Sequence, residues 1–240
     1  MAAELYVLEM DDMQQSAVDL ADPTRLVFDY VRRIGDLVDA MPEGPLRVLH
    51  VGGAAMTLPR YVAATRPRSP QIVLEPAAEV VERVRAEAPL PPRSGIKVRP
   101  VPGESGILAV RDASQDVVIL DAFDGGRVPS SLTSPAFVAQ VRRVLTPSGM
   151  FVANLVDRPP YPLVRAFVAA ARDLGSLVVG AEPATVKGRR SGNLVIACGA
   201  VPAGAFGDPS PLEYRVFRGQ AVADSFGAAR AGRVRTPPRP

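Results

Sequence analysis

Short aliphatic runs alternate with helix-spaced apolar positions along most of the chain. The run at 116–121 contains Val, Val, Ile and Leu in succession, which is typical of a strand buried on both faces of a sheet. Between 24 and 40, apolar residues instead recur every three or four positions, as on one face of a helix. The pattern predicts strands at 47–51, 71–75, 97–101, 116–121, 150–154, 176–180 and 193–197, and helices at 24–40, 57–66, 77–88, 134–145 and 161–174.

The order of these elements determines how the strands can pair. Parallel strands need crossover connections, and helical segments lie between most of the first five predicted strands. The last two strands are joined by a loop, around 187–192, that is too short for a crossover helix, so they should pair antiparallel. We therefore expect an α/β fold: a doubly wound, mostly parallel seven-stranded sheet with an antiparallel C-terminal hairpin.

Both ends of the chain depart from this pattern. Residues 1–22 are acidic and irregular, although the apolar stretch at 5–8 could form one strand of a small hairpin. The α/β domain is expected over 23–218, because apolar periodicity is lost from about residue 219. Residues 219–240 are expected to form a flexible basic tail.

Composition and charge narrow the classes of partner. Nearly half of the 240 residues are apolar and 22% are charged, which is typical of a globular protein. The formal net charge is +3, but residues 226–240 carry four arginines and no acid, so the rest of the chain is left with −1. Nucleic-acid binding would need a basic surface on folded elements, and it is not expected. The four arginines are Arg230, Arg233, Arg235 and Arg239.

The chain has one cysteine, Cys198, within an apolar run. A single cysteine excludes an internal disulfide and a multi-cysteine metal site, and this one is expected to be buried and inert. No apolar run approaches the roughly 18 residues of a membrane span, and the acidic N-terminal stretch is unlike a signal peptide. We expect a cytoplasmic protein with no metal and no membrane partner.

Small residues and an acid follow the first two predicted strands. Gly52 and Gly53 form a turn into a helix, where a backbone can approach a ligand closely. Glu75 ends the second strand, where a carboxylate commonly accepts hydrogen bonds from ribose hydroxyls. A tight strand-to-helix turn and a solvated strand-end acid are the alternatives.

Acidic residues also follow the third and fourth predicted strands. Gly103 and Glu104 follow the third, where Glu104 could face the exocyclic amine of an adenine. Asp121 ends the fourth, and Asp124 stands three residues further on in a Gly-rich loop. Two carboxylates on such a loop suit the binding of a cationic substrate or the removal of a proton from an amine. An Asp that caps a turn is the alternative.

Three segments resemble motifs of the spermidine synthase family. Residues 48–60 (VLHVGGAAMTLPR) resemble V-L-x-I-G-G-G-D-G-G-x-x-R, with both glycines and the closing arginine in place. Residues 120–137 resemble D-S-S-D-P-x-G-P-x-x-x-L-F. Residues 8–16 (LEMDDMQQS) resemble L-D-G-x-x-Q, which aligns Gln15 with a glutamine that contacts the nucleoside. The resemblance covers about residues 5–200.

The resemblance implies the Rossmann-like fold shared by aminopropyltransferases and methyltransferases. It also implies a nucleoside co-substrate, S-adenosylmethionine or its decarboxylated form, and a small amine acceptor such as putrescine. Within that family Glu75 would bind ribose and Asp121 would deprotonate the attacking amine, and the chain could form a homodimer. The implied site residues are Asp121 as the base; Gln15, Gly52, Gly53, Glu75, Gly103 and Glu104 for the nucleoside; and Asp124 and Tyr30 for the amine.

One departure from the motif leaves the reaction open. Ala55 stands where the family has the aspartate that holds the amino end of the aminopropyl chain, and a buried ammonium without a counter-charge costs on the order of a few kcal/mol. The lone histidine, His50, lies inside the first predicted strand and is expected to be a core residue. A methyltransferase that uses S-adenosylmethionine and a non-catalytic nucleoside-binding homologue are therefore the alternatives to aminopropyl transfer.

Overall fold

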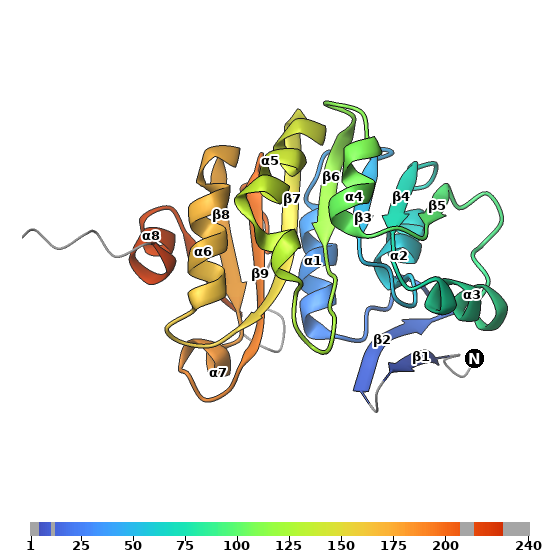
Figure 1. The fold of residues 1–240 in the computed structure, drawn as a ribbon, viewed down its shortest axis with the longest axis horizontal. Helices are drawn as coiled ribbons and strands as arrows, with labels where there is room; N and C mark the ends of the chain where they lie inside the picture. Colours follow the sequence, from blue (N-terminus) through green and yellow to red (C-terminus); the bar gives the residue numbers. More distant parts are fainter. Residues whose placement is uncertain (1–4, 11–12, 207–213, 228–240) are drawn as a thin grey trace, which may run out of the picture.

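Figure 1 shows the computed structural model, which describes residues 5–10, 13–206 and 214–227. One sheet contains eight strands: β3 (Val48–Val51), β4 (Gln71–Leu74), β5 (Ile96–Arg99), β6 (Gln115–Leu120), β7 (Leu145–Asp157), β8 (Ser176–Ala181), β9 (Gly192–Gly199) and β10 (Arg215–Arg218). Their order across the sheet is β10-β8-β9-β7-β6-β3-β4-β5. The strands from β5 to β7 pair in parallel, whereas β9, β8 and β10 pair antiparallel. The predicted fold class is confirmed.

The sheet has one strand more than the sequence pattern predicts. In β10 only Val216 and Phe217 stand between two arginines, which is too short an apolar run to indicate a strand. The strand nevertheless forms, because its backbone pairs with the edge of β8. The C-terminal hairpin is therefore extended by a third antiparallel strand.

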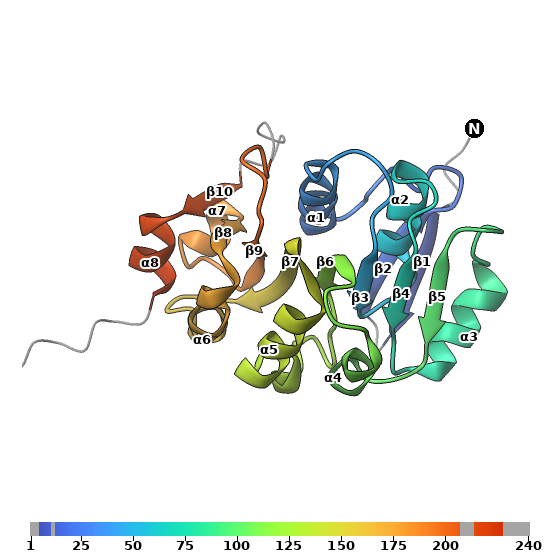
Figure 2. The same cartoon turned by 90° about the horizontal axis from the view of Figure 1, so that it is seen from above.

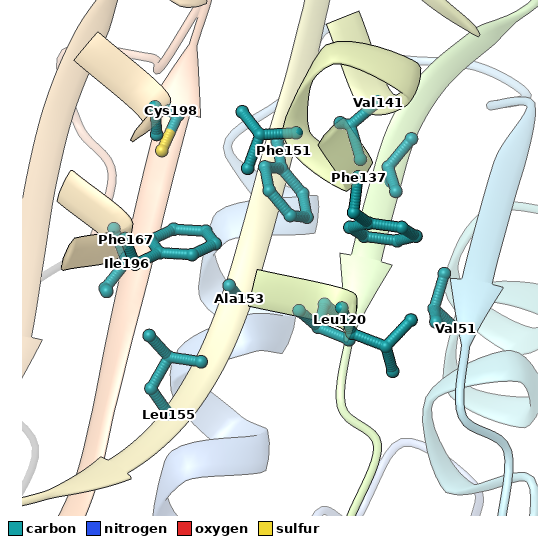
Figure 3. Close-up of a cluster of buried hydrophobic side chains, with 14 of the residues drawn as sticks. Val51, Leu120, Phe137, Val141, Phe151, Ala153, Leu155, Phe167, Ile196 and Cys198 are labelled. Carbon is teal, nitrogen blue, oxygen red and sulfur yellow. The ribbon is translucent and has the colours of Figure 1, made fainter. Parts of the chain in front are cut away.

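Helices cover both faces of the sheet, as Figure 2 shows. The helices α1 (Asp29–Asp39) and α2 (Thr57–Thr65) lie on one face, and α4 (Gly103–Gly106), α5 (Pro135–Val144) and α6 (Pro162–Ala171) lie on the other. On the second face Phe137 and Phe167 flank Phe151 of β7 (Figure 3), with 5.6 Å between the ring centroids of Phe151 and Phe167. Burial on both faces explains why the parallel strands are almost continuously apolar.

Most predicted helices match the structure, but the first begins later than expected. The predicted helix at 24–40 starts only at Asp29, because the segment before it is held irregular by Arg32, whose side chain donates to the carbonyls of Leu26 and Val27. The helix α3 (Ala78–Glu87) lies within the range predicted for it, and α6 continues into a short turn, η3 (Arg172–Leu174). Four short elements are not indicated by the pattern: α4, η1 (Ile107–Ala109), η2 (Ser130–Thr133) and α7 (Pro183–Val186).

The N-terminal segment forms a hairpin beside the sheet. β1 (Leu5–Met10) and β2 (Met13–Asp19) pair antiparallel. Leu8 and Val18 of the hairpin are buried in the same cluster as Val80 and Val84 of α3. The hairpin therefore covers the turn that follows β3, from which Ala55 joins the cluster.

The expectation of a flexible tail from residue 219 is wrong for residues 220–226. They form α8 (Gln220–Phe226), whose Val222 and Phe226 lie four residues apart and are buried. The Phe226 ring packs 5.1 Å from the rings of Tyr161 and Phe217. Residues 228–240, which include all four arginines of the predicted tail, lie outside the described residues.

Two expectations about composition can be compared with the structure. Cys198 is fully buried in β9, and burial raises the pKa of its thiol, as expected for an inert cysteine. Within the described ranges, no helix is both long enough and apolar enough to cross a bilayer.

Candidate active site

A cleft of about 540 Å³ lies at the carboxyl ends of β3, β4 and β6. Because β3 has β4 on one side and β6 on the other, the chain connections diverge here, and parallel α/β sheets bind ligands at such a point. Gln15 lies in β2, and its side chain is outside the described part of the structure. The other eight predicted site residues all line the cleft: Tyr30, Gly52, Gly53, Glu75, Gly103, Glu104, Asp121 and Asp124.

The turn after β3 has a tightly confined backbone. Gly52 has a φ of +93°, and a Cβ at this position would lie 2.3 Å from the carbonyl oxygen of Asp121, so only glycine fits. Ala54 and Met56 carry side chains at φ values of 41° and 62°, in the left-handed region. That conformation costs a residue with a Cβ roughly 1–2 kcal/mol. Surrounding contacts must therefore hold the turn in place.

Glu75 supplies part of that support from the end of β4. Its Oε2 accepts hydrogen bonds from the backbone N–H groups of Gly53, at 2.9 Å, and Ala54, at 3.2 Å. Its Oε1 accepts the N–H of Ala77 at 3.2 Å. A carboxylate has about four acceptor positions, so roughly one remains for a ligand hydroxyl. Glu75 is thus a structural part of the turn as well as a lining residue of the cleft.

Asp121, directly after β6, is held by two polar neighbours. Its Oδ1 accepts a hydrogen bond from Asn154 Nδ2 at 3.0 Å, and the Tyr30 hydroxyl lies 3.5 Å from its Oδ2, a long contact. Burial raises the pKa of Asp121 to about 6, although both hydrogen bonds act in the opposite direction. Burial and the charge of Asp121 raise the pKa of Tyr30, so its hydroxyl keeps the proton. A carboxylate with a pKa near 6 can act as a general base around neutral pH.

Asp124 is exposed on the loop that follows. Gly125 and Gly126 have positive φ values and make the two-residue turn in which Asp124 and Arg127 exchange backbone hydrogen bonds of 2.8 and 3.0 Å. The turn fixes the Asp124 backbone at a position that lines the cleft.

Gly103 and Glu104 open α4 on the opposite wall. A Cβ on Gly103 would lie 2.4 Å from Cγ1 of Val51, so the close approach of α4 to β3 requires glycine here. Glu104 is exposed in the cleft wall. Packing therefore accounts for Gly103 without any ligand.

The charge of the cleft is of one sign. Among the described residues that line it there is no lysine or arginine. His50 also lines the cleft, but it is neutral at physiological pH because burial lowers its pKa to about 4. The resulting negative potential favours cationic ligands. The lining acids are Glu75, Glu79, Glu104, Asp121 and Asp124.

Three polar side chains of the site are not among the residues predicted from the sequence. Ser16 Oγ and Thr57 Oγ1 lie 2.8 Å apart in the cleft wall, and Asn154 orients Asp121. Asn154 ends the strand predicted at 150–154, so its position at the carboxyl edge is a signal that the sequence offers. Nothing in the local sequence marks Ser16 or Thr57.

Ala55 and His50 are both buried, but only His50 lines the cleft. Ala55 is fully buried in a cluster with Leu8 and Val73 and is not among the residues that line the cleft. Its neighbour Ala54 lines the cleft instead. His50 is buried, as predicted for a core residue, and it is also one of the residues that line the cleft. No group of three His, Cys, Asp or Glu suited to a metal ion occurs within the part of the chain that the structure describes.

Comparison with known sequences finds polyamine aminopropyltransferases, whereas no protein-family model matches the chain. The polyamine aminopropyltransferase of Chromobacterium violaceum is 27% identical over 141 residues, which cover 58% of this chain and 53% of that protein. The enzyme of the same name from Neisseria meningitidis is 26% identical over 147 residues, covering 60% and 54%. The chain thus matches about half the length of these curated relatives.

Solved structures resemble the chain over a larger share of its length. A probable spermidine synthase from Corynebacterium glutamicum has a TM-score of 0.84 at 24% identity, over 98% of this chain and 92% of that one. Human methyltransferase-like protein 13 in complex with SAH has a TM-score of 0.60 at 20% identity, over 75% of this chain and 85% of that one. A spermidine synthase in complex with the transition state analogue AdoDATO has a TM-score of 0.56 at 18% identity, over 82% of this chain and 72% of that one. The chain therefore has the Rossmann-like fold that spermidine synthases share with methyltransferases, and its curated homologues are polyamine aminopropyltransferases.

Proposed function

We propose that the protein is an aminopropyltransferase, which binds decarboxylated S-adenosylmethionine and transfers its aminopropyl group to a small amine such as putrescine. The observation that carries this proposal is the charge of the cleft, which is lined by five acids and by no lysine or arginine among the described residues. The decarboxylated nucleoside carries a sulfonium and an ammonium, and the acceptor is also a cation in solution. Both substrates therefore match the potential of the site.

The same cleft is a poor match for ordinary S-adenosylmethionine. That nucleoside carries a carboxylate, which needs a cationic side chain or free backbone N–H groups. The N–H groups of Gly53 and Ala54, at the turn where such a carboxylate could bind, already donate to Glu75. An uncompensated carboxylate would also be repelled by the lining acids. Decarboxylation removes this conflict.

Asp121 has the role of general base in this proposal. Its carboxylate takes a proton from the ammonium of the acceptor, and the freed nitrogen lone pair attacks the aminopropyl carbon bonded to sulfur. The new C–N bond forms as the C–S bond breaks, and the bonding pair leaves with sulfur, which becomes the neutral thioether of methylthioadenosine. Tyr30 and Asn154 hold the Asp121 carboxylate at the cleft floor during this step. Positioning of the two substrates supplies the rest of the rate enhancement.

The remaining site residues have proposed roles in binding. Glu75 accepts a ribose hydroxyl with the position that its Oε1 retains, and Gln15, Gly52 and Gly53 contact the same nucleoside. Gly103 and Glu104 form the wall beside the adenine. Asp124 and Tyr30 bind the amine, and a homodimer in the cytoplasm is the proposed form of the protein.

Calorimetric titration together with a transfer assay tests this proposal. We expect decarboxylated S-adenosylmethionine to bind at least tenfold more tightly than S-adenosylmethionine, and methylthioadenosine to appear when putrescine is added. Tighter binding of S-adenosylmethionine would favour the methyltransferase alternative. The structural likeness to methyltransferase-like protein 13 is the reason for testing that alternative. Nucleoside binding without transfer to any amine would instead support a non-catalytic homologue.

A further inference from the structure

The single histidine of the chain occupies an unusual position at the cleft floor. His50 lies in β3, is 1% exposed and lines the cleft. Its Nε2 is 2.8 Å from Gln71 Oε1. The Gln71 amide is oriented by a second bond, since its Nε2 donates to the carbonyl of Pro59 at 3.0 Å. Gln71 Oε1 is therefore the acceptor, and His50 Nε2 carries the ring proton.

In this tautomer His50 Nδ1 is unprotonated and can only accept a hydrogen bond. Nδ1 is buried and has no hydrogen-bond partner in the described structure. Protonation does not relieve this, because burial disfavours the charged ring and lowers the pKa of His50 to about 4. Buried acceptors are nearly always satisfied in folded proteins, so an unpartnered one beside a cleft points to a ligand that donates.

The surroundings of His50 indicate which kind of donor fits. β3 pairs in parallel with β6, with His50 opposite Ile119, so Asp121 follows two residues later on the same face of the sheet. Asn154, which holds Asp121, has a second buried acceptor without a partner, its Oδ1. The groups near Asp121 are thus mainly acceptors, and the described lining contains no lysine or arginine to donate. A primary alkylammonium, with three N–H donors and no acceptor, is the complement of such a set.

We propose that His50 Nδ1 accepts a hydrogen bond from a primary alkylammonium group in the cleft and so selects amine-bearing substrates. This inference rests on the proposed aminopropyl transfer, in which two such groups occur: the end of the aminopropyl chain and the acceptor amine. His50 replaces none of the lining acids; it adds a neutral, directional acceptor to a site whose acids supply charge. It is a specificity residue and takes no part in proton transfer.

Because the chain has one histidine, nitrogen NMR can observe Nδ1 directly. Long-range ¹H–¹⁵N spectra of the full chain should show an unprotonated Nδ1 and a protonated Nε2. The Nδ1 resonance should move toward the hydrogen-bonded range when an ammonium occupies the site. A shift with decarboxylated S-adenosylmethionine but not with methylthioadenosine would show that Nδ1 binds the ammonium of the aminopropyl chain. A shift with putrescine, alone or added to methylthioadenosine, would show that Nδ1 binds the ammonium of the acceptor substrate. An Nδ1 resonance unchanged by every one of these ligands overturns the inference.

Two substitutions separate this role from a purely structural one. His50→Gln can keep the bond to Gln71 but places no acceptor at the Nδ1 position, whereas His50→Asn places an amide oxygen near that position. We expect His50→Gln to weaken the ammonium-bearing ligand about tenfold while methylthioadenosine binds as before, and His50→Asn to restore much of that loss. Equal losses for both nucleosides, with a lowered melting temperature, would mean that His50 only supports the fold. If Nδ1 responds to putrescine while no transfer occurs, the inference stands and the proposed function fails.

Discussion

Asn154 donates a hydrogen bond from its Nδ2 to Oδ1 of Asp121 at 3.0 Å, across the neighbouring strands β7 and β6. The bond fixes the plane of the carboxylate and lowers the pKa of Asp121 against the larger effect of burial. Oδ2 then faces the Tyr30 hydroxyl, 3.5 Å away. The reactivity of Asp121 is therefore set by residues that are distant from it in the chain.

Asp121→Asn should abolish transfer while leaving the cleft intact. The amide oxygen can still accept the Asn154 hydrogen bond, but the residue can no longer take up a proton. We expect turnover to fall by about 10²- to 10⁴-fold, with nucleoside affinity unchanged. Single-turnover assays and calorimetry measure the two quantities, and an active variant would place the base elsewhere.

The raised pKa of Asp121 predicts how stability changes with pH. Burial raises the pKa from 3.8 to about 6, so between these values the folded protein holds more protons than the unfolded chain. The free energy of unfolding should therefore fall as pH rises through this window, by at most about 3 kcal/mol. The Asp121→Asn protein has no group at this position that ionises, so its free energy of unfolding should not fall for this reason. It should be more stable than wild type at pH 7 and nearly equal to it at pH 4. Denaturant titrations at the two pH values compare the proteins.

Asn154→Leu should shift the pH dependence of transfer. Wild-type kcat/KM is expected to decline below pH 6 as Asp121 becomes protonated. Loss of the Asn154 hydrogen bond removes an effect that lowers the pKa, so the decline should begin at a higher pH. The pH profile of kcat/KM tests this, and an unmoved profile would show that Asn154 does not influence the base.

Glu75→Ala should weaken nucleoside binding and the fold together. The substitution leaves the N–H groups of Gly53, Ala54 and Ala77 without their acceptor, and each such bond to a carboxylate contributes about 1.5–3 kcal/mol at most. We expect a lower melting temperature and at least a tenfold loss of nucleoside affinity. Glu75→Gln is the matched control, since it keeps one acceptor oxygen and should lose less of both. Unchanged affinity in a folded Glu75→Ala protein would remove Glu75 from the nucleoside site.

Carboxylates added at adjacent positions should act in different ways. Ala55→Asp places a charge in the apolar cluster with Leu8 and Val73, and should destabilise the protein by several kcal/mol. Ala54→Asp adds the charge to the cleft, at a left-handed φ of 41° that Asp tolerates better than most residues. Only this second variant should increase the preference for the decarboxylated nucleoside. Thermal unfolding and competition titration measure the two effects, and a stable, donor-selective Ala55→Asp protein would show that the side chain at position 55 faces the cleft.

The fold could be predicted where hydrophobic pattern alone decides it, and the site could be predicted only in part. The run at 116–121 indicates a buried strand, and Asp121 stands at its end, so the position of that acid follows from the strand. β10 is stabilised by backbone pairing with β8, which leaves little trace in its own residues. Likewise the orientation of His50 depends on Gln71, 21 residues away, and that of Asp121 on Asn154, 33 residues away. Such partners come together only in the folded chain.

Ala54 and Met56 stand at left-handed positions of the turn after β3, where the family motif has glycine. A glycine turn samples many backbone shapes, and a ligand that needs one of them must freeze the others. With side chains present, that restriction is already imposed when the chain folds. The turn should thus meet its ligand as a rigid surface, so that association requires little further loss of backbone entropy there.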